Sequence, residues 1–111
     1  MKAKPVKLIY GEGYVDCPIS ESTHITINIP GPSGKLTLPV ITHGTRKDTG
    51  CWSWNGNVDA PTLKPSVKTN GGNHIEGEWT CHTWITDGKA IFLNDTTHEH
   101  AGKTLDLLDI E

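Results

Sequence analysis

The alternation of apolar and polar side chains is most regular at residues 23–29. Isoleucine occupies every second position of this segment from residue 25 onward, which places apolar and polar side chains on opposite faces of an extended strand. Residues 30–34 are rich in proline and glycine and predict a turn. The apolar residues of 36–40 again fall on alternate positions and predict the returning strand.

A β-hairpin is predicted at residues 79–94. Asp87-Gly88 lies between two strand-like runs, and this dipeptide suits a tight turn in which both central residues have positive φ. Because a two-residue turn fixes the register, Trp84 is expected opposite Ile91. The same register brings the beginning of the hairpin beside residues 95–98.

Turn residues separate the other short apolar runs. The chain has twelve glycines and seven prolines, and no run keeps helical periodicity long enough to predict a helix. Polar segments at 43–50, 57–65 and 70–77 predict loops that are expected to line one rim, and 66–68 predicts a short strand that nearby prolines restrict to a sheet edge. The predicted fold class is all-β: a single domain of residues 1–111, built as an antiparallel sheet or sandwich of short strands with long polar loops.

The composition argues against nucleic acid and membrane as partners. The 111 residues carry a formal net charge of −3 without the basic stripe that holds duplex nucleic acid by its phosphates, so no such partner is expected. No segment approaches the roughly 20 apolar residues needed to cross a bilayer, and residues 1–10 lack the pattern of a signal peptide. A cytoplasmic location without membrane contact is predicted, and the oligomeric state stays open, a homo-oligomer included.

Histidine is the main source of candidate chemistry. Six histidines occur in the chain, and imidazole binds metals, binds phosphate and transfers protons near neutral pH. Three of them, together with one carboxylate, are the candidate catalytic residues: His24, His82, His98 and Asp95. For each histidine the alternative interpretation is a solvent-facing residue, and Cys81 must point to the face opposite His82 in a regular strand.

Candidate ligand-binding residues lie in the predicted loops and at their edges. Trp54 precedes a turn and offers a flat face on which a base or sugar can stack, whereas Trp52 is expected to pack in the core. Thr62 and Ser66 carry hydroxyls that can contact a ligand or cap turns beside the prolines. The candidate ligand-binding residues are Trp54, Asn55, Thr62, Ser66 and Arg46.

Several short motifs support a resemblance to a known family. The motifs are C-P at 17–18 with His24, W-x-W-N-G at 52–56, P-T-L-x-P-S at 61–66, C-H-x-W at 81–84, D-G at 87–88, and D-x-T-H at 95–98 followed by A-G at 101–102. With them the chain resembles a family of small, poorly characterised phage and bacterial proteins, some of which carry the label ammonia monooxygenase. The resemblance extends from residue 17 over nearly the whole chain.

The resemblance also implies a zinc site that this chain does not reproduce in full. Related members carry cysteine where this sequence has Ser20 and Thr96, which together with Cys17 and Cys81 would give a four-cysteine set for tetrahedral zinc. A hydroxyl is a poor zinc ligand at neutral pH. Cys17 and Cys81 are therefore candidate metal ligands of a remnant site, and the cofactor is either zinc or none.

Three hypotheses of function follow. The first is a hydrolase, phosphodiesterase-like, acting on a phosphate-bearing small molecule such as a nucleotide signal; a phage origin, implied by the resemblance, would make this a counter to host defence in the host cytoplasm. The second is a binding module that sequesters a nucleotide signal or a host protein, and the third is a structural zinc-binding module. We favour the enzyme because histidines with a carboxylate suit bond cleavage, whereas anion-binding pockets more often use arginine.

Overall fold

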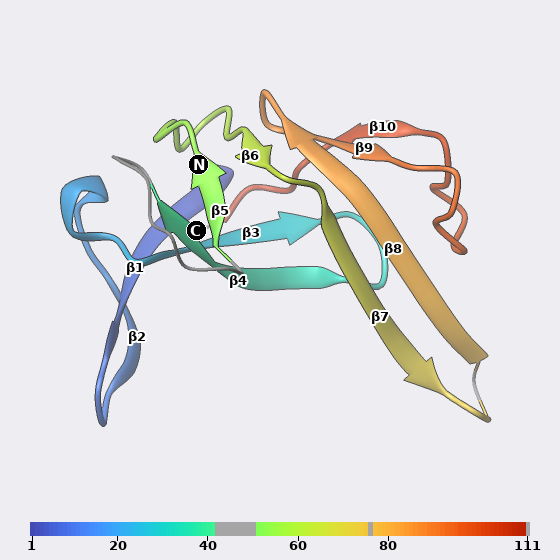
Figure 1. Ribbon diagram of the computed structural model, residues 1–111, viewed down its shortest axis with the longest axis horizontal. Helices are drawn as coiled ribbons and strands as arrows, with labels where there is room; N and C mark the ends of the chain where they lie inside the picture. The colour runs from blue at the N-terminus through green and yellow to red at the C-terminus, as the bar shows by residue number, and fades with distance from the viewer. Residues whose placement is uncertain (42–50, 76, 111) are drawn as a thin grey trace.

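The computed structural model describes residues 1–41, 51–75 and 77–110 and confirms the all-β prediction (Figure 1). Its helical content within these residues is one short 3-10 helix, η1 (Ile19–Glu21). The strands are β1 (Ala3–Ile9), β2 (Gly13–Asp16), β3 (His24–Ile29), β4 (Gly34–Ile41), β5 (Trp52–Trp54), β6 (Leu63–Lys64), β7 (Val67–Asn73), β8 (Gly77–Thr86), β9 (Lys89–Phe92) and β10 (Thr104–Asp106). Among the described residues, no helix is long and apolar enough to cross a membrane.

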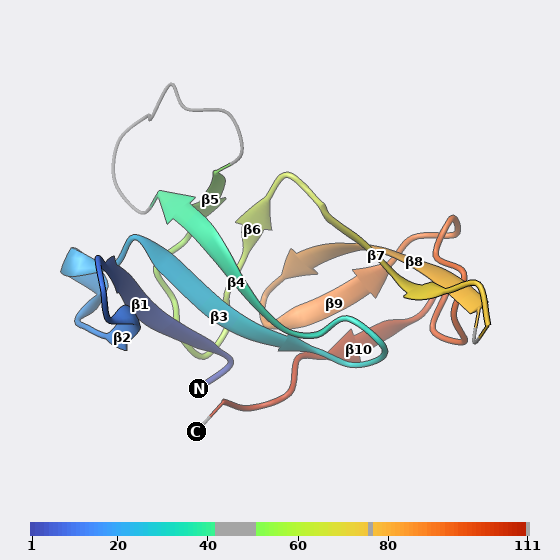
Figure 2. The ribbon, with the colours of Figure 1, turned by 90° about the horizontal axis from the view of Figure 1, so that it is seen from below.

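The strands form two sheets, which Figure 2 shows on either side of the molecule. The first sheet has the order β2-β1-β3-β4-β5-β6 and the second has the order β10-β9-β8-β7. Neighbouring strands are antiparallel except β4 and β5, which are parallel. The predicted strand and its return are β3 and β4, which pair antiparallel with Ile27 opposite Leu36.

The two sheets share one hydrophobic core. The isoleucines of β3, predicted to lie on one face, are all buried, and none is more than 1% exposed. From the second sheet, Cys81 and Ile85 on β8 join the same cluster. This burial fixes which face of β8 is inward, so His82 and Trp84, which alternate with the buried Cys81, Thr83 and Ile85, point to the outer face of the sheet.

The hairpin at Asp87-Gly88 forms as predicted. Both residues have positive φ, 50° and 75°, and Trp84 lies opposite Ile91. The chain then passes back along β8, where the Thr97 N–H donates a hydrogen bond to the Thr80 carbonyl (2.9 Å). The segment after the hairpin therefore lies beside β8, as its register predicted.

The prediction of a loop at 70–77 is wrong for residues 70–73. These residues belong to β7, which continues to Asn73 and pairs with β8 along the whole length of β7. Gly71 makes this possible, because a β-carbon there would collide with the indole of Trp79. The short strand predicted at 66–68 is thus longer than expected. It does lie at the edge of its sheet. The predicted loop at 43–50 lies outside the described residues.

Candidate active site

Ser66, His82 and Asp95 form one chain of hydrogen bonds. The Ser66 Oγ lies 2.8 Å from His82 Nε2. On the other side of the imidazole, His82 Nδ1 lies 2.9 Å from Asp95 Oδ2 and 3.1 Å from Asp95 Oδ1. A hydroxyl, an imidazole and a carboxylate in this order are the groups of a nucleophile, its base and the group that orients the base.

The pairing of β7 with β8 brings the first two residues together. Val67 lies opposite Thr83 and Lys68 lies opposite His82, so Ser66, immediately before β7, is the diagonal neighbour of His82 on the outer face. The indole N–H of Trp52 donates a hydrogen bond to the Ser66 carbonyl (3.3 Å). The backbone of Ser66 is thereby linked to the other sheet.

Thr96 holds the third residue in place. Its hydroxyl accepts a hydrogen bond from the His82 N–H (3.1 Å) and donates one to the His82 carbonyl (3.0 Å). Thr96 is buried, with 5% of its surface exposed, and it directly follows Asp95. Its hydroxyl therefore fixes the Asp95 backbone relative to His82, whose imidazole contacts the Asp95 carboxylate.

The protonation states follow from this geometry. The hydrogen bond from His82 lowers the pKa of Asp95, and the charges of His82 and Lys68 act in the same direction. An ionised carboxylate can only accept, so Nδ1 of His82 must carry the proton and donate it. In the neutral imidazole, Nε2 then has a lone pair that can accept the hydrogen bond of the Ser66 hydroxyl, which is the tautomer required of a general base.

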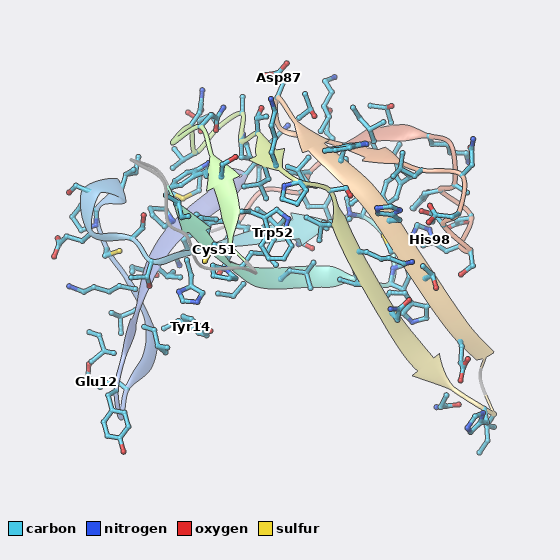
Figure 3. All side chains as sticks on the ribbon, in the orientation of Figure 1. Glu12, Tyr14, Cys51, Trp52, Asp87 and His98 are labelled. Atoms are coloured by element: carbon cyan, nitrogen blue, oxygen red, sulfur yellow. The ribbon has the colours of Figure 1, made fainter. Side chains whose placement is uncertain are left out.

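The other two candidate histidines lie elsewhere. His24 Nδ1 is 2.8 Å from the Thr23 hydroxyl, and its ring packs against Tyr14 with the centroids 5.0 Å apart. His98 packs against Phe92. Figure 3 shows Tyr14 beside β2 and His98 beyond β8, at opposite sides of the molecule. The structure thus unites His82 with Ser66 and Asp95 and does not gather the three histidines.

Both tryptophans of β5 contribute to the core, Trp54 as a member and Trp52 packed against it. Trp54 is 4% exposed and belongs to the core, so its ring is not available for stacking on a ligand. Trp52 is half-buried, and its indole N–H donates a hydrogen bond to the Ser66 carbonyl. Both side chains belong to the short strand β5, and Trp54, at its last position, is more deeply buried than Trp52.

Asn55 and Thr62 serve the local structure. The Asn55 side chain accepts hydrogen bonds from the N–H groups of Asn57 (3.2 Å) and Thr62 (3.1 Å), which closes the turn. The Thr62 hydroxyl accepts a hydrogen bond from the N–H of Asp87 (2.9 Å) and joins this turn to the hairpin. Arg46, the remaining candidate ligand-binding residue, lies outside the described residues.

The structure does not bring the two candidate zinc cysteines together. Cys81 faces the core, and burial raises the pKa of its thiol. Cys17 follows β2 in the other sheet, where its N–H donates a hydrogen bond to the Pro5 carbonyl (3.3 Å). Within the described parts of the chain, no three side chains of histidine, cysteine, aspartate or glutamate are arranged to hold a metal ion. Thr96 is one of the two residues at which related members were expected to carry cysteine. Its hydroxyl instead forms hydrogen bonds with the His82 backbone.

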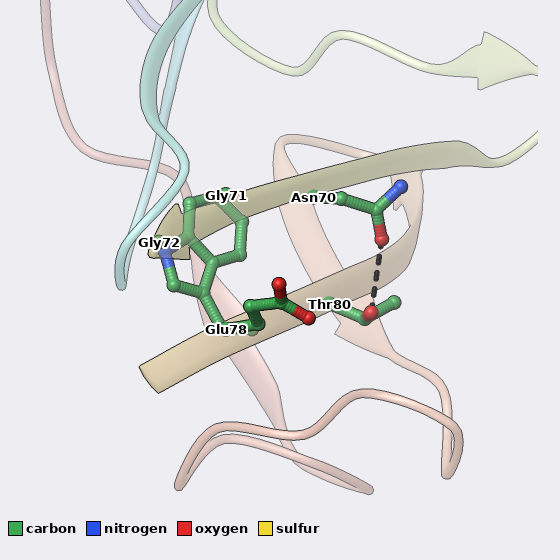
Figure 4. A pocket seen from close by; sticks show the side chains of 6 residues that line it. Asn70, Gly71, Gly72, Glu78 and Thr80 are labelled. Atoms are coloured by element: carbon green, nitrogen blue, oxygen red, sulfur yellow. Dashed lines mark hydrogen bonds between the residues drawn. The ribbon is translucent and has the colours of Figure 1, made fainter. Parts of the chain in front are cut away.

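A surface depression of about 380 Å³ lies farther along the same two strands (Figure 4). Asn70 and Thr80 line it and are joined by a hydrogen bond of 2.9 Å between their side chains. This pair follows Lys68 and His82 in the register. The depression is therefore a neighbour of the hydrogen-bonded site and does not contain it.

Serine, histidine and carboxylate in this order is the arrangement that serine hydrolases use, and here it lies on an all-β scaffold. Residues 12–93 match a protein-family model, BubE, described as a bacterial ubiquitination-like system serine protease. The match covers well over half of the chain, so the protein belongs to the BubE family; Ser66 and His82 lie inside the matched residues and Asp95 lies just beyond them. No curated protein and no solved structure matches the chain.

Family membership corrects the expected function. A hydrolase or binding module for a nucleotide signal that counters host defence is contradicted by the family's description as a serine protease. The geometry explains the error, because the expectation rested on three histidines converging around a phosphate, whereas only His82 joins the site. The coarser expectation of an enzyme, and of a hydrolase, agrees with the family.

Ser66 was the residue whose role the sequence analysis missed. It was expected to be a ligand contact or a turn cap, because it follows Pro65 directly. The order serine, histidine, aspartate was present in the sequence. Only the pairing of β7 with β8 reveals that the serine and the histidine are neighbours.

Proposed function

We propose that this protein is a serine protease in which Ser66 is the nucleophile, His82 the general base and Asp95 the residue that orients the base. The observation that carries the proposal is the continuous hydrogen-bond chain from the Ser66 hydroxyl through both imidazole nitrogens to the Asp95 carboxylate. The family description supports it independently of this geometry.

In the proposed reaction, Ser66 Oγ attacks the carbonyl carbon of a peptide bond while its proton passes to His82 Nε2. The negative charge of Asp95 stabilises the imidazolium that forms. His82 then gives the proton to the leaving amine nitrogen as the C–N bond breaks, which leaves an ester between the substrate's acyl group and Ser66. A water molecule, deprotonated by the same imidazole, hydrolyses this ester and restores the Ser66 hydroxyl.

The openness of the site favours a polypeptide substrate. The His82 side chain is 24% exposed and that of Asp95 is 53% exposed, and both lie on the outer face of a sheet. Small-molecule sites are usually concave and enclose most of the ligand, whereas an open sheet face can accept an extended chain. Because the family description names a ubiquitination-like system, we infer that the cleaved bond belongs to a protein of such a system.

A fluorophosphonate probe tests the nucleophile directly. It phosphonylates an activated serine, so we expect mass spectrometry to find the modification on Ser66 of the intact protein. Ser66→Ala should abolish it, and His82→Ala should slow it at least about 100-fold, a usual contribution of a general base. Ser20→Ala, which removes an exposed hydroxyl in η1, is the matched control and should label normally. Labelling elsewhere, or none, would show that Ser66 is not an activated nucleophile.

A further inference from the structure

Two other side chains occupy the same patch of the outer sheet face as the Ser66–His82 pair. Lys68 lies directly opposite His82. When the register is continued by one step, Ser66 lies opposite Trp84. Ser66 and His82 thus occupy one diagonal of this block of four residues, and Lys68 and Trp84 occupy the other. A chain that runs along the second diagonal, from Lys68 to Trp84, crosses over the Ser66–His82 pair at its centre.

Trp84 presents an apolar surface at this place. Its side chain is among the exposed large hydrophobics, at 39%, whereas Trp54 is buried at 4%. Trp84 lies opposite the half-buried Ile91, so the indole is supported from the neighbouring strand. Exposed tryptophans of this kind contribute strongly when a partner covers them.

Lys68 presents a positive charge on the other side of the catalytic pair. The residue is exposed, and in the described part of the chain its side chain forms no ion pair or hydrogen bond. The hydrogen bond from His82 is the main cause that lowers the pKa of Asp95, and the charge of Lys68 adds a smaller effect in the same direction, so the ammonium group lies near the site. An ammonium with three free donors there is suited to bind a carboxylate of the substrate.

Building on the proposed protease function, we propose that Lys68 and Trp84 select the substrate, an extended peptide with an acidic side chain on one side of the cleaved bond and an apolar side chain on the other. Diagonal neighbours across two strands are about 7–8 Å apart. In an extended chain, side chains two positions apart lie on the same face and are separated by about 7 Å. The expected signature is therefore an apolar and an acidic residue two positions apart, with the cleaved bond between them.

The test is to digest a proteome-derived peptide library with the full-length protein and to identify the cleaved bonds by mass spectrometry. Cleavage sites of the parent protein should be enriched in the predicted pair. Lys68→Met should reduce the acidic preference about two- to fivefold, the effect of an exposed ion pair, without changing the apolar one. Lys68→Glu should replace the acidic preference with a basic one. Trp84→Ala should lower cleavage of apolar-containing sites about tenfold.

Matched controls and fluorophosphonate labelling separate the outcomes. Lys35→Met and Leu8→Ala remove an exposed lysine and an exposed leucine from the other sheet and should leave the cleavage pattern unchanged. If the parent protein is labelled at Ser66 and cleaves peptides without this enrichment, or if Lys68→Glu and Trp84→Ala cleave the same sites, the selection proposal is wrong and the protease stands. If the parent protein is neither labelled nor active, both proposals fall.

Discussion

At the scale of single residues, the site depends on a carboxylate that is unusually open. Just over half of the Asp95 side chain is exposed, so water weakens its electrostatic effect on His82 compared with a buried carboxylate. Its hydrogen bond still selects the tautomer of His82. We therefore expect Asp95 to act mainly through orientation and less through charge.

Asp95→Asn should lower the rate of peptide cleavage about 10²- to 10³-fold, less than the roughly 10⁴-fold seen when a buried triad aspartate is changed in the same way. The amide can donate to Nδ1 and so favour the tautomer that leaves Nε2 unable to accept the serine proton. The measurement is kcat on a peptide that the parent protein cleaves, with Asp59→Asn, an exposed aspartate outside the site, as control. A loss below fivefold would mean that Asp95 does not orient the base.

The sequence predicted two of these three residues as catalytic and gave the third another role. His82 and Asp95 could be placed near each other because a two-residue turn fixes the register of the hairpin that carries them. Ser66 could not, because its position depends on the pairing of Val67 with Thr83 and of Lys68 with His82. The residue types of the short strand predicted at 66–68 do not indicate which strand it pairs with.

At the scale of elements, the hairpin and the segment that follows it act as one support for the site. The hairpin places His82, and the hydrogen bonds of Thr96 and Thr97 then attach the following segment to the outside of β8. The turn of the hairpin, the register of its two strands and the return of residues 95–98 along β8 were all predictable from local residue types. The hydroxyl of Thr96 was not, because a buried threonine shows no pattern in the sequence that distinguishes it from an exposed one.

Thr96→Val should lower the free energy of unfolding by about 1–3 kcal/mol, because the part-buried His82 N–H loses its acceptor, whereas the His82 carbonyl keeps the hydrogen bond from the Leu93 N–H. It should also slow fluorophosphonate labelling of Ser66, since Asp95 is no longer held against His82. Urea unfolding and labelling rates measure the two effects. Thr96→Ser keeps the hydroxyl and is the control, expected to retain most of both. If valine and serine behave alike, the hydroxyl does not hold the segment.

At the scale of the whole molecule, the two sheets meet in one core, and the arrangement of their strands was the least predictable feature. The alternation in β3 and β4 predicted strands and faces correctly. It carried no information on the parallel pairing of β4 with β5, or on which tryptophan of β5 would be buried. The order and direction of strands depend on packing between residues that are distant in the sequence. Short strands with similar apolar patterns do not specify this packing.

The stability of the whole molecule should fall at acid pH partly through His98. Burial, followed by the charge of His100, lowers the pKa of His98 from its ordinary value of 6.5. The proton is therefore bound more tightly by the unfolded chain, so the stability that the neutral ring contributes is fully present above pH 6.5 and is lost as the pH falls from there toward the lower pKa of the folded state.

His98→Asn should flatten this dependence, because an amide oxygen can replace Nδ1 as acceptor for the His100 N–H and does not titrate. The free energy of unfolding, measured by urea titration between about pH 7 and pH 5, should decline less steeply in the variant than in the parent protein. His74→Asn is the matched control, since that side chain is 98% exposed and its replacement should leave the slope unchanged. Equal slopes for His98→Asn and the parent protein would mean that His98 takes up its proton as readily in the folded protein as in the unfolded chain.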